Sequence, residues 1–137
     1  LVDDELMNDN NVIKLISLEV FAGTKGQKAV LELDVYGKIL KTEQSGDGPV
    51  DSIFKSIKEL FPHEANLQLY QVHAVTEGTD AQATVSVRIE EKGKISVGQA
   101  ADTDTLVASA KAYINALNKL IIKRKRTAPN DEFSAAI

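Results

Sequence analysis

The sequence predicts an α+β fold built from two successive βββα units. Apolar and polar residues alternate along several short segments, as in half-buried strands, and two other segments have the period of an amphipathic helix. The tripeptide Gly37-Lys38-Ile39 recurs as Gly93-Lys94-Ile95 at the same place in the second half, which indicates an internal duplication. We therefore expect two small antiparallel sheets, with two helices packed on them or between them.

The first unit is expected at residues 13–62. Three segments have the composition and alternation of strands, and glycine-containing turns at Gly23–Gly26 and Gly37–Lys38 separate them; they are 13–21, 29–36 and 39–44. A turn at 45–49 then leads into a helical pattern, which Pro62 ends. The apolar positions of this helix are Ile53, Phe54, Ile57, Leu60 and Phe61.

The second unit is expected at residues 66–122. It repeats the plan with three predicted strands at 67–77, 82–90 and 94–99, and the polar residues 76–80 are interpreted as a loop or bulge. The small residues 98–102 predict a turn that opens the second helix. The apolar stripe of this helix consists of Leu106, Val107, Ala110, Ile114, Leu117 and Ile121.

Both ends of the chain are expected to lie outside the folded domain, which we place at residues 12–126. Residues 1–11 are acidic and have no period, so they predict a linker from a missing upstream region. Residues 127–137 contain Pro129 and several small residues, which favours a flexible tail. The basic run 123–126 fits the solvated C-terminal end of a helix, where cations complement the helix dipole.

Composition argues against several classes of protein. The net charge of −4 disfavours nucleic acid as a partner, and no apolar run approaches the length of a membrane span. The chain has no cysteine, which suits a cytoplasmic location. His63 and His73 lack the spacing of metal ligands, and no serine nucleophile motif is present. We therefore expect no catalytic residue, metal or cofactor in this chain, and an exposed His63 after Pro62.

The helix-opening turns are the candidate ligand site. In the first of them, GDGPVD at 46–51, glycines allow a ligand to approach the backbone and Pro49 suits a first helical position. One interpretation is a well-capped helix, with Asp47 and Asp51 near its positive end. The other is a site where backbone N–H groups hold the carboxylate of a small ligand and an acidic side chain meets its ammonium group.

Three strings carry a resemblance to a known family. They are GDGPVD at 46–51, VTEGTDAQATVSVRIE at 75–90, and GQAADTDTLVASAKAYINALNKL at 98–120. Together they resemble the C-terminal regulatory domain of the 2-isopropylmalate synthases, which the related citramalate synthases share. The resemblance covers roughly residues 13–121. It implies a duplicated βββα fold, a homodimer, and a feedback amino acid bound near the interface between domains.

The resemblance also implies what lies outside this chain. The parent enzyme condenses acetyl-CoA with 2-oxoisovalerate in a catalytic barrel that holds a divalent metal. The His-x-His metal motif of that barrel is absent from this sequence, so the chemistry would belong to a parent catalytic domain. The fragment itself would then be a regulatory and dimerisation domain.

Carried over by motif, the effector pocket takes residues from four segments. The matching positions are Gly46, Asp47, Gly48, Pro49 and Val50 from the first turn, Leu67, Tyr70 and Ala74 from the fourth strand, Ala81, and Ala100 and Ala101 from the second turn. The small Gly46 and Ala74 would leave room for leucine, which is the effector of the isopropylmalate branch. The alternatives are an isoleucine-sensing citramalate synthase domain, or a dimerisation domain without a ligand.

Overall fold

The computed structural model describes residues 12–75 and 82–136. The expected linker at 1–11 and the expected loop at 76–80 lie outside the described residues. The elements, in chain order, are β1 (Ile13–Gly23), β2 (Gly26–Val35), β3 (Lys38–Gly46), α2 (Pro49–Leu60), β4 (Asn66–Val75), β5 (Gln82–Glu91), β6 (Lys94–Asp102) and α3 (Thr105–Ala136).

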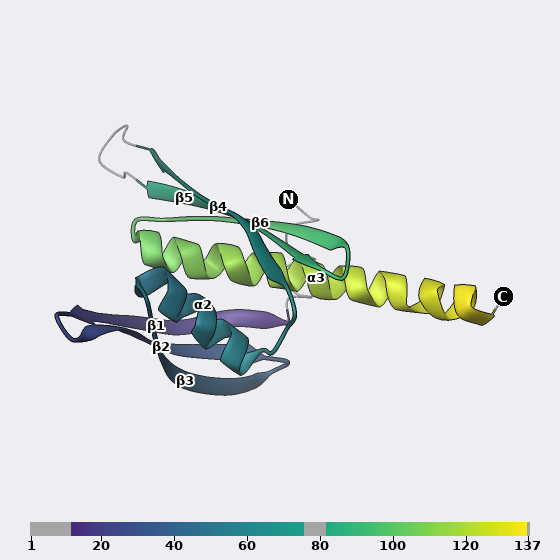
Figure 1. Ribbon diagram of the computed structural model, residues 1–137, viewed down its shortest axis with the longest axis horizontal. Coiled ribbons are helices and arrows are strands. Elements are labelled where there is room, and N and C mark those ends of the chain that lie inside the picture. The colour runs from purple at the N-terminus through teal and green to yellow at the C-terminus, as the bar shows by residue number, and fades with distance from the viewer. Residues whose placement is uncertain (1–11, 76–81, 137) are drawn as a thin grey trace.

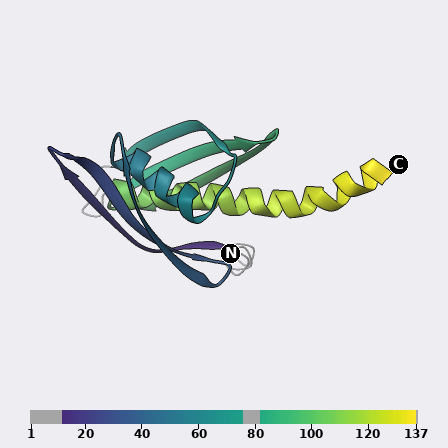
Figure 2. The same ribbon diagram turned by 60° about the horizontal axis from the view of Figure 1, so that its bottom comes forward.

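The elements form three layers. Strands β1, β2 and β3 make one antiparallel sheet, here called sheet A, and β4, β5 and β6 make a second, sheet B. Both helices lie between the two sheets (Figures 1 and 2). Helix α2 packs on β2 and β3, and α3 packs on β5 and β6. The predicted α+β fold of two βββα units is thereby confirmed.

The two units share fine details of their backbones. The β2–β3 turn has positive φ at Tyr36 (53°) and Gly37 (81°), and the β5–β6 turn repeats this at Lys92 (51°) and Gly93 (82°). Positive φ at both central residues is the signature of a type I′ hairpin, whose twist matches that of the flanking strands. The turns are therefore centred one residue earlier than predicted at Gly37.

A bulge lies at the equivalent place in the first strand of each unit. The register with the neighbouring strand shifts between Leu15 and Ser17 in β1, and between Leu67 and Leu69 in β4. One extra residue switches the face to which later side chains point. As a result, residues on both sides of each bulge can face the helices, which a strict alternation along 13–21 or 67–77 would not allow.

The core is formed by the inner faces of β2 and β5 together with the helices. Alternate residues of these central strands are buried, as their sequence pattern predicts; they are Ala29, Leu31, Leu33 and Val35 in β2, and Ala83, Val85, Val87 and Ile89 in β5. Helix α2 contributes Ile53 and Ile57, which are fully buried. Burial of such side chains stabilises a fold by about 1.5–3 kcal/mol each.

Helix α3 is buried over more of its circumference than its predicted stripe. Ile114, Leu117 and Ile121 are buried as expected. The further buried side chains are Ala108, Ala112, Tyr113, Ala116, Asn118 and Leu120. A helix enclosed by other elements on several sides needs apolar or small residues all round, and α3 is enclosed by sheet B, α2 and β1.

Small residues allow α3 to lie very close to β6. A side-chain Cβ added at Gly98 would overlap the carbonyl oxygen of Ala112 and the backbone nitrogen of Ala116. Ser96 on the same face of β6 donates a hydrogen bond to the Ala116 carbonyl oxygen, 2.6 Å away. The run of small residues in β6 therefore serves helix–sheet packing.

This packing corrects the prediction of a second small-residue turn. Residues 98–102 belong to β6, where Ala100 pairs with Val85 and Ala101 pairs with Thr84. The loop before α3 is Thr103–Asp104 instead. Small residues fit both a turn and a close helix contact, and the sequence does not distinguish the two.

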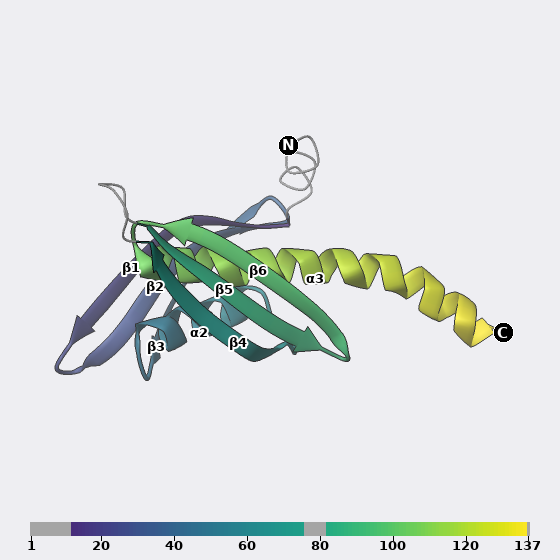
Figure 3. The same cartoon turned by 90° about the horizontal axis from the view of Figure 1, so that it is seen from above.

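Helix α3 continues to Ala136, into the segment 127–137 that was expected to be a tail, and the flexibility of that segment stays a prediction. The run from 122 to 136 contains no glycine, and an established helix extends at the gain of one hydrogen bond per residue. The C-terminal part of α3 projects beyond both sheets (Figure 3).

Replacing Gly98 by alanine should lower the free energy of unfolding by about 1–3 kcal/mol, because the added methyl group has to displace the backbone of α3. Urea denaturation measures this change. Gly23→Ala is the matched control: a Cβ at Gly23 meets no atom within 4 Å, so its effect should stay within about 0.5 kcal/mol. Equal effects of the two substitutions would contradict the close packing of α3 on β6.

Candidate functional site

The start of α2 is held in a tight arrangement around Gly46, the last residue of β3. A Cβ at Gly46 would lie 2.6 Å from Oδ2 of Asp51 and 2.7 Å from the backbone nitrogen of Ser52, so only glycine fits without a shift. The same Oδ2 accepts a hydrogen bond from the Asp47 N–H (3.0 Å) and pairs with Lys55 (3.1 Å). These contacts, first of all the Asp47 hydrogen bond, lower the pKa of Asp51.

The N-terminus of α2 has no side-chain cap. Gly48 occupies the N-cap position and Pro49 begins the helix. Ser52 N–H donates to the Gly48 carbonyl oxygen, and no described side chain accepts a hydrogen bond from the N–H groups of Val50 or Asp51. This helix end therefore leaves backbone donors and a partial positive charge for another group.

The start of α3 is different, because the chain caps it with its own carboxylates. Oδ1 of Asp104 accepts a hydrogen bond from the Leu106 N–H (2.8 Å), and Oδ1 of Asp102 accepts one from the Asp104 N–H (2.9 Å). Lys111 pairs with the other oxygen of Asp102 (3.2 Å). Of the two duplicated helix starts, only the one in α2 remains open.

Tyr70 on β4 contacts α2, the helix with the open start. Its ring contacts Phe54 edge-on, with 5.9 Å between the ring centroids, and Phe54 lies one helical turn after Val50. The Tyr70 hydroxyl lies 2.7 Å from Oγ of Ser109. Ser109 donates its own hydrogen to the Thr105 carbonyl oxygen, so Tyr70 is the donor. Tyr70 thus joins β4 to the first turns of both helices.

The structure brings some of the predicted site residues together and separates others. Gly46 to Val50 form the α2 start, and Tyr70 lies near it through Phe54. Leu67 is on the same face of β4 but on the other side of the bulge, opposite Ile89. The backbone of Ala74 continues this face and pairs with Ala83. Ala81 lies outside the described residues.

Ala100 and Ala101 do not form a second helix-opening turn. In β6 they point to opposite faces, since successive side chains of a strand alternate. Ala100 lies on the inner face opposite Val85, and Ala101 lies on the outer face opposite Thr84. Ala101 therefore points away from the helix layer and from Tyr70.

Sequence reasoning missed a buried row of side chains behind the site. Tyr113 of α3 contacts Phe54, with ring centroids 4.3 Å apart, and its hydroxyl lies 3.3 Å from Nε2 of His63. Burial raises the pKa of Tyr113 to about 12. The spacing of Leu106, Ser109 and Tyr113 could have indicated this row, because residues at i, i+3 and i+7 lie on the same face of a helix.

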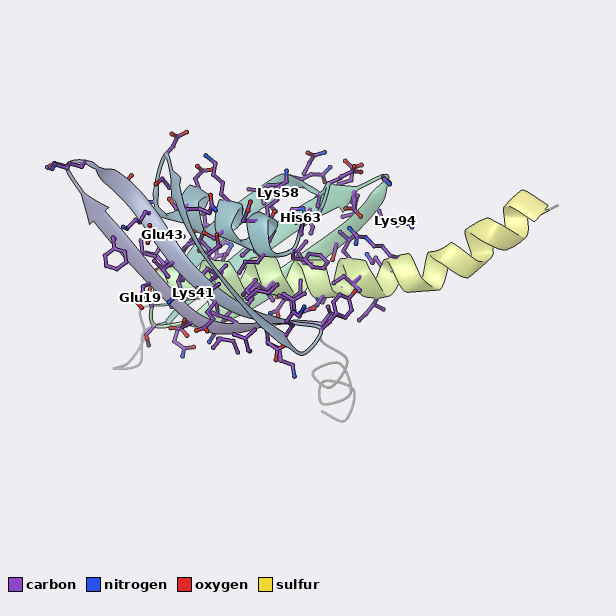
Figure 4. All side chains as sticks on the ribbon, turned by 90° about the horizontal axis from the view of Figure 1, so that it is seen from below. Glu19, Lys41, Glu43, Lys58, His63 and Lys94 are labelled. Atoms are coloured by element: carbon purple, nitrogen blue, oxygen red, sulfur yellow. The ribbon has the colours of Figure 1, made fainter. Side chains whose placement is uncertain are left out.

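His63 is buried, which contradicts the expectation that it is exposed; only 8% of its surface is accessible. Its Nδ1 accepts a hydrogen bond from the Ala65 N–H at 3.1 Å, so this nitrogen carries no proton. Burial lowers the pKa of His63, and the neighbouring cations Lys58 and Arg124 also lower it, whereas Glu91 raises it. Figure 4 shows His63 and Lys58 near each other at the end of α2.

Glu91 at the end of β5 fastens three elements next to His63. Its carboxylate accepts two hydrogen bonds from Arg124 of α3 (2.7 and 2.5 Å) and one from the Glu64 N–H (3.0 Å). Burial raises the pKa of Glu91, but these hydrogen bonds outweigh it and the pKa is lowered overall. This cluster links the α2–β4 connection and the end of β5 to α3.

Among the described residues, no three His, Cys, Asp or Glu side chains are placed to hold a metal ion. In the same part of the chain, no helix is long and apolar enough to cross a membrane.

Two βββα units around one helical layer define an internally duplicated α+β domain with one uncapped helix start. The chain matches the family described as the LeuA allosteric (dimerisation) domain over residues 1–121, and it belongs to this family. This confirms the family resemblance of the three sequence strings.

The chain is also similar to part of several curated 2-isopropylmalate synthases. It is 58% identical over 129 residues to that of Caulobacter sp. (strain K31), covering 94% of the chain and 25% of the relative. It is 56% identical over 138 residues to that of Rhodopseudomonas palustris (strain TIE-1), covering 100% of the chain and 26% of the relative. The chain thus spans about a quarter of the length of these relatives.

Because His63 is buried, the stability of the domain should depend on pH. Unfolded His63 binds a proton near its ordinary pKa of 6.5, whereas the folded form binds it only at lower pH. Because the unfolded state then binds more protons, the free energy of unfolding should fall as the pH drops below about 6.5. Urea midpoints at about pH 7.5 and about pH 5.5 measure this loss.

His63→Asn should reduce this loss, because an amide oxygen can accept the Ala65 N–H and does not titrate in that range. His73→Asn, at an exposed position on the outer face of β4, is the matched control for a histidine-to-asparagine substitution. The lowered pKa values of Asp51, Glu91 and Asp102 act at more acidic pH. An unchanged pH dependence in His63→Asn would refute the assignment.

Proposed function

We propose that this domain is the leucine sensor of a 2-isopropylmalate synthase. In this proposal leucine, the end product of the pathway, binds the domain and inhibits the condensation of acetyl-CoA with 2-oxoisovalerate. The chemistry, with its divalent metal, belongs to a parent catalytic domain in the remaining three quarters of the relatives' length. The domain works as a homodimer, in agreement with the family description as a dimerisation domain, and its location is the cytoplasm.

The open start of α2 is the observation that carries the proposal. An α-amino acid presents a carboxylate and an ammonium group a few ångströms apart. The N–H groups of Val50 and Asp51 have no side-chain acceptor, and they lie at the positive end of the helix dipole, which favours a carboxylate. Because α3 is capped by its own Asp104, the duplication supplies one such site and not two.

Asp47 is the acidic side chain that we assign to the ligand ammonium. It lies beside the open helix start and is exposed. Asp51 is less suitable, because its carboxylate already binds the Asp47 N–H and Lys55. The ligand carboxylate would thus bind the start of α2 and its ammonium group would bind Asp47. This arrangement orients the ligand side chain toward β4.

The inner face of β4 supplies the apolar wall. Tyr70 and Phe54 form an aromatic corner next to the helix start. Val72, two residues further along the same face, is 42% exposed, so it has apolar surface that a branched aliphatic side chain can cover. Burial of such surface is worth roughly 25 cal/mol per Å².

The preference for leucine over isoleucine rests on fewer residues than the sequence predicted. The small size of Gly46 is explained by contacts within the α2 start, so it does not by itself report room for a ligand. The preference then rests on Ala74 and on the family, whose relatives named above are 2-isopropylmalate synthases. A misplaced methyl group in a pocket changes binding by about 1–3 kcal/mol.

Calorimetric titration should show that leucine binds this chain more tightly than isoleucine or valine. Leucine should also raise the melting temperature, since a ligand that binds only the folded state stabilises it. No heat and no stabilisation at millimolar concentration, from a chain that sediments as a dimer, would instead indicate a purely structural dimerisation domain. Tighter binding of isoleucine would favour the citramalate synthase alternative.

Tyr70→Ala should weaken leucine binding about tenfold or more, because it removes the aromatic wall of the site. His73→Ala on the same strand is the matched control, since His73 lies on the outer face of β4 and is exposed. Circular dichroism would confirm that both variants are folded. Equal leucine affinity in the two variants would mean that the site lies elsewhere.

A further inference from the structure

Strand β4 differs from the other edge strands of the two sheets. Each three-stranded sheet leaves two edges, which are β1 and β3 in sheet A and β4 and β6 in sheet B. The ten residues of β4, NLQLYQVHAV, include no Asp, Glu, Lys or Arg, although 26% of the whole chain is charged. Its polar side chains are those of Asn66, Gln68, Tyr70, Gln71 and His73.

The other three edge strands carry the charges that discourage pairing with another chain. These are Lys14 and Glu19 in β1, Lys38, Lys41 and Glu43 in β3, and Lys94 and Asp102 in β6. Figure 4 shows Glu19, Lys41 and Glu43 on sheet A. Charged side chains, lysine above all, are the usual protection of an exposed edge against strand addition.

Side chains of α3 also bind backbone groups in two of these edge strands. Asn118 binds the backbone N–H and carbonyl oxygen of Ile13 in β1, each at 2.9 Å. Asn115 donates to the Gln99 carbonyl oxygen of β6 (2.8 Å), and Lys123 donates to that of Ile95. Within the described part of the chain, no hydrogen bond from outside sheet B reaches the backbone of β4.

The inner face of β4 is open as well. In β5, Ile89 and Val85 are fully buried, yet their neighbours across the sheet in β4, Leu67 and Val72, are 45% and 42% exposed. Neither helix packs along β4, and its contact with them comes through Tyr70. The 12 residues of α2 extend about 18 Å, so α2 is too short to cover the ten residues of β4, which extend about 33 Å.

We infer that β4 is the edge along which two copies of this domain pair. A long, uncharged edge strand with an open apolar face is a template for strand addition unless something covers it. The family to which the chain belongs is described as a dimerisation domain, so the second copy is the occupant that the comparisons supply. The inference rests on that dimerisation and is independent of which amino acid binds.

Pairing about a twofold axis sets the geometry. Two β4 strands would lie antiparallel and join two copies of sheet B into one six-stranded sheet, as a self-complementary interface requires. The bulge before Leu69 leaves Leu69–Val75 as the regular stretch, and Val72 is its midpoint. Val72 of each copy then lies beside the axis, next to its counterpart on the same face of the joined sheet.

Cysteine cross-linking tests this arrangement in the complete chain, which has no cysteine of its own. Val72→Cys should give a covalent dimer under mild oxidation, because disulfides form only between Cβ atoms about 3.5–4.5 Å apart. Gln71→Cys and His73→Cys extend the scan to the neighbouring registers. Val97→Cys on the other edge of sheet B is the matched control, since Val97 is 43% exposed, and it should stay monomeric on a denaturing gel.

A charge placed on the same strand provides a second measurement. Val72→Lys would put two like charges beside the axis, and it should raise the dimer dissociation constant in sedimentation at least tenfold relative to Val97→Lys. Cross-linking through Val97 and none through β4, or a Val72→Lys dimer as tight as the wild type, would overturn the inference. A monomeric wild type that still binds leucine would overturn it too, and would leave the sensor proposal standing.

Discussion

The close approach of α3 to β6 at Gly98 is the constraint on which the rest of the structure depends. Gly98 has no side chain, so the backbones of α3 and β6 approach each other closely. The opposite side of α3 contacts α2 and β1. Asn118 on that side binds the backbone at Ile13 and so ties the first strand of the chain to its last helix. One helix therefore belongs to the cores of both units.

The duplication is close in the strands and unequal in the helices. The hairpin turns and the bulges repeat almost unchanged, whereas α2 has 12 residues and α3 has 32. The helix starts differ in their caps, since Asp104 closes α3 and Gly48 leaves α2 open. The difference in caps lies at the helix starts, whereas the extra length of α3 lies at its C-terminal end.

Tyr70 lies where strand β4 meets the two helices. It contacts Phe54 of α2 and donates a hydrogen bond to Ser109 of α3, so a shift of β4 affects the first turns of both helices. Phe54 in turn packs on Tyr113, whose hydroxyl is close to His63. Because such interiors are closely packed, these side chains cannot move independently. A ligand at the α2 start and a second copy along β4 would therefore act on one connected cluster.

The sequence by itself determined the type and order of the elements, the duplication, the apolar faces of β2 and β5, and the glycine-proline start of α2. These features follow from local periods and turn chemistry, which depend on neighbours in the chain. It did not determine that residues 98–102 form a strand, that His63 is buried, or that Tyr113 backs the site. The tertiary structure decided these points, because a small residue, a histidine or a tyrosine takes its role from the element that packs against it. The open edge of β4 was also decided by the tertiary structure, since only the arrangement of α2 and α3 shows that neither helix packs along it.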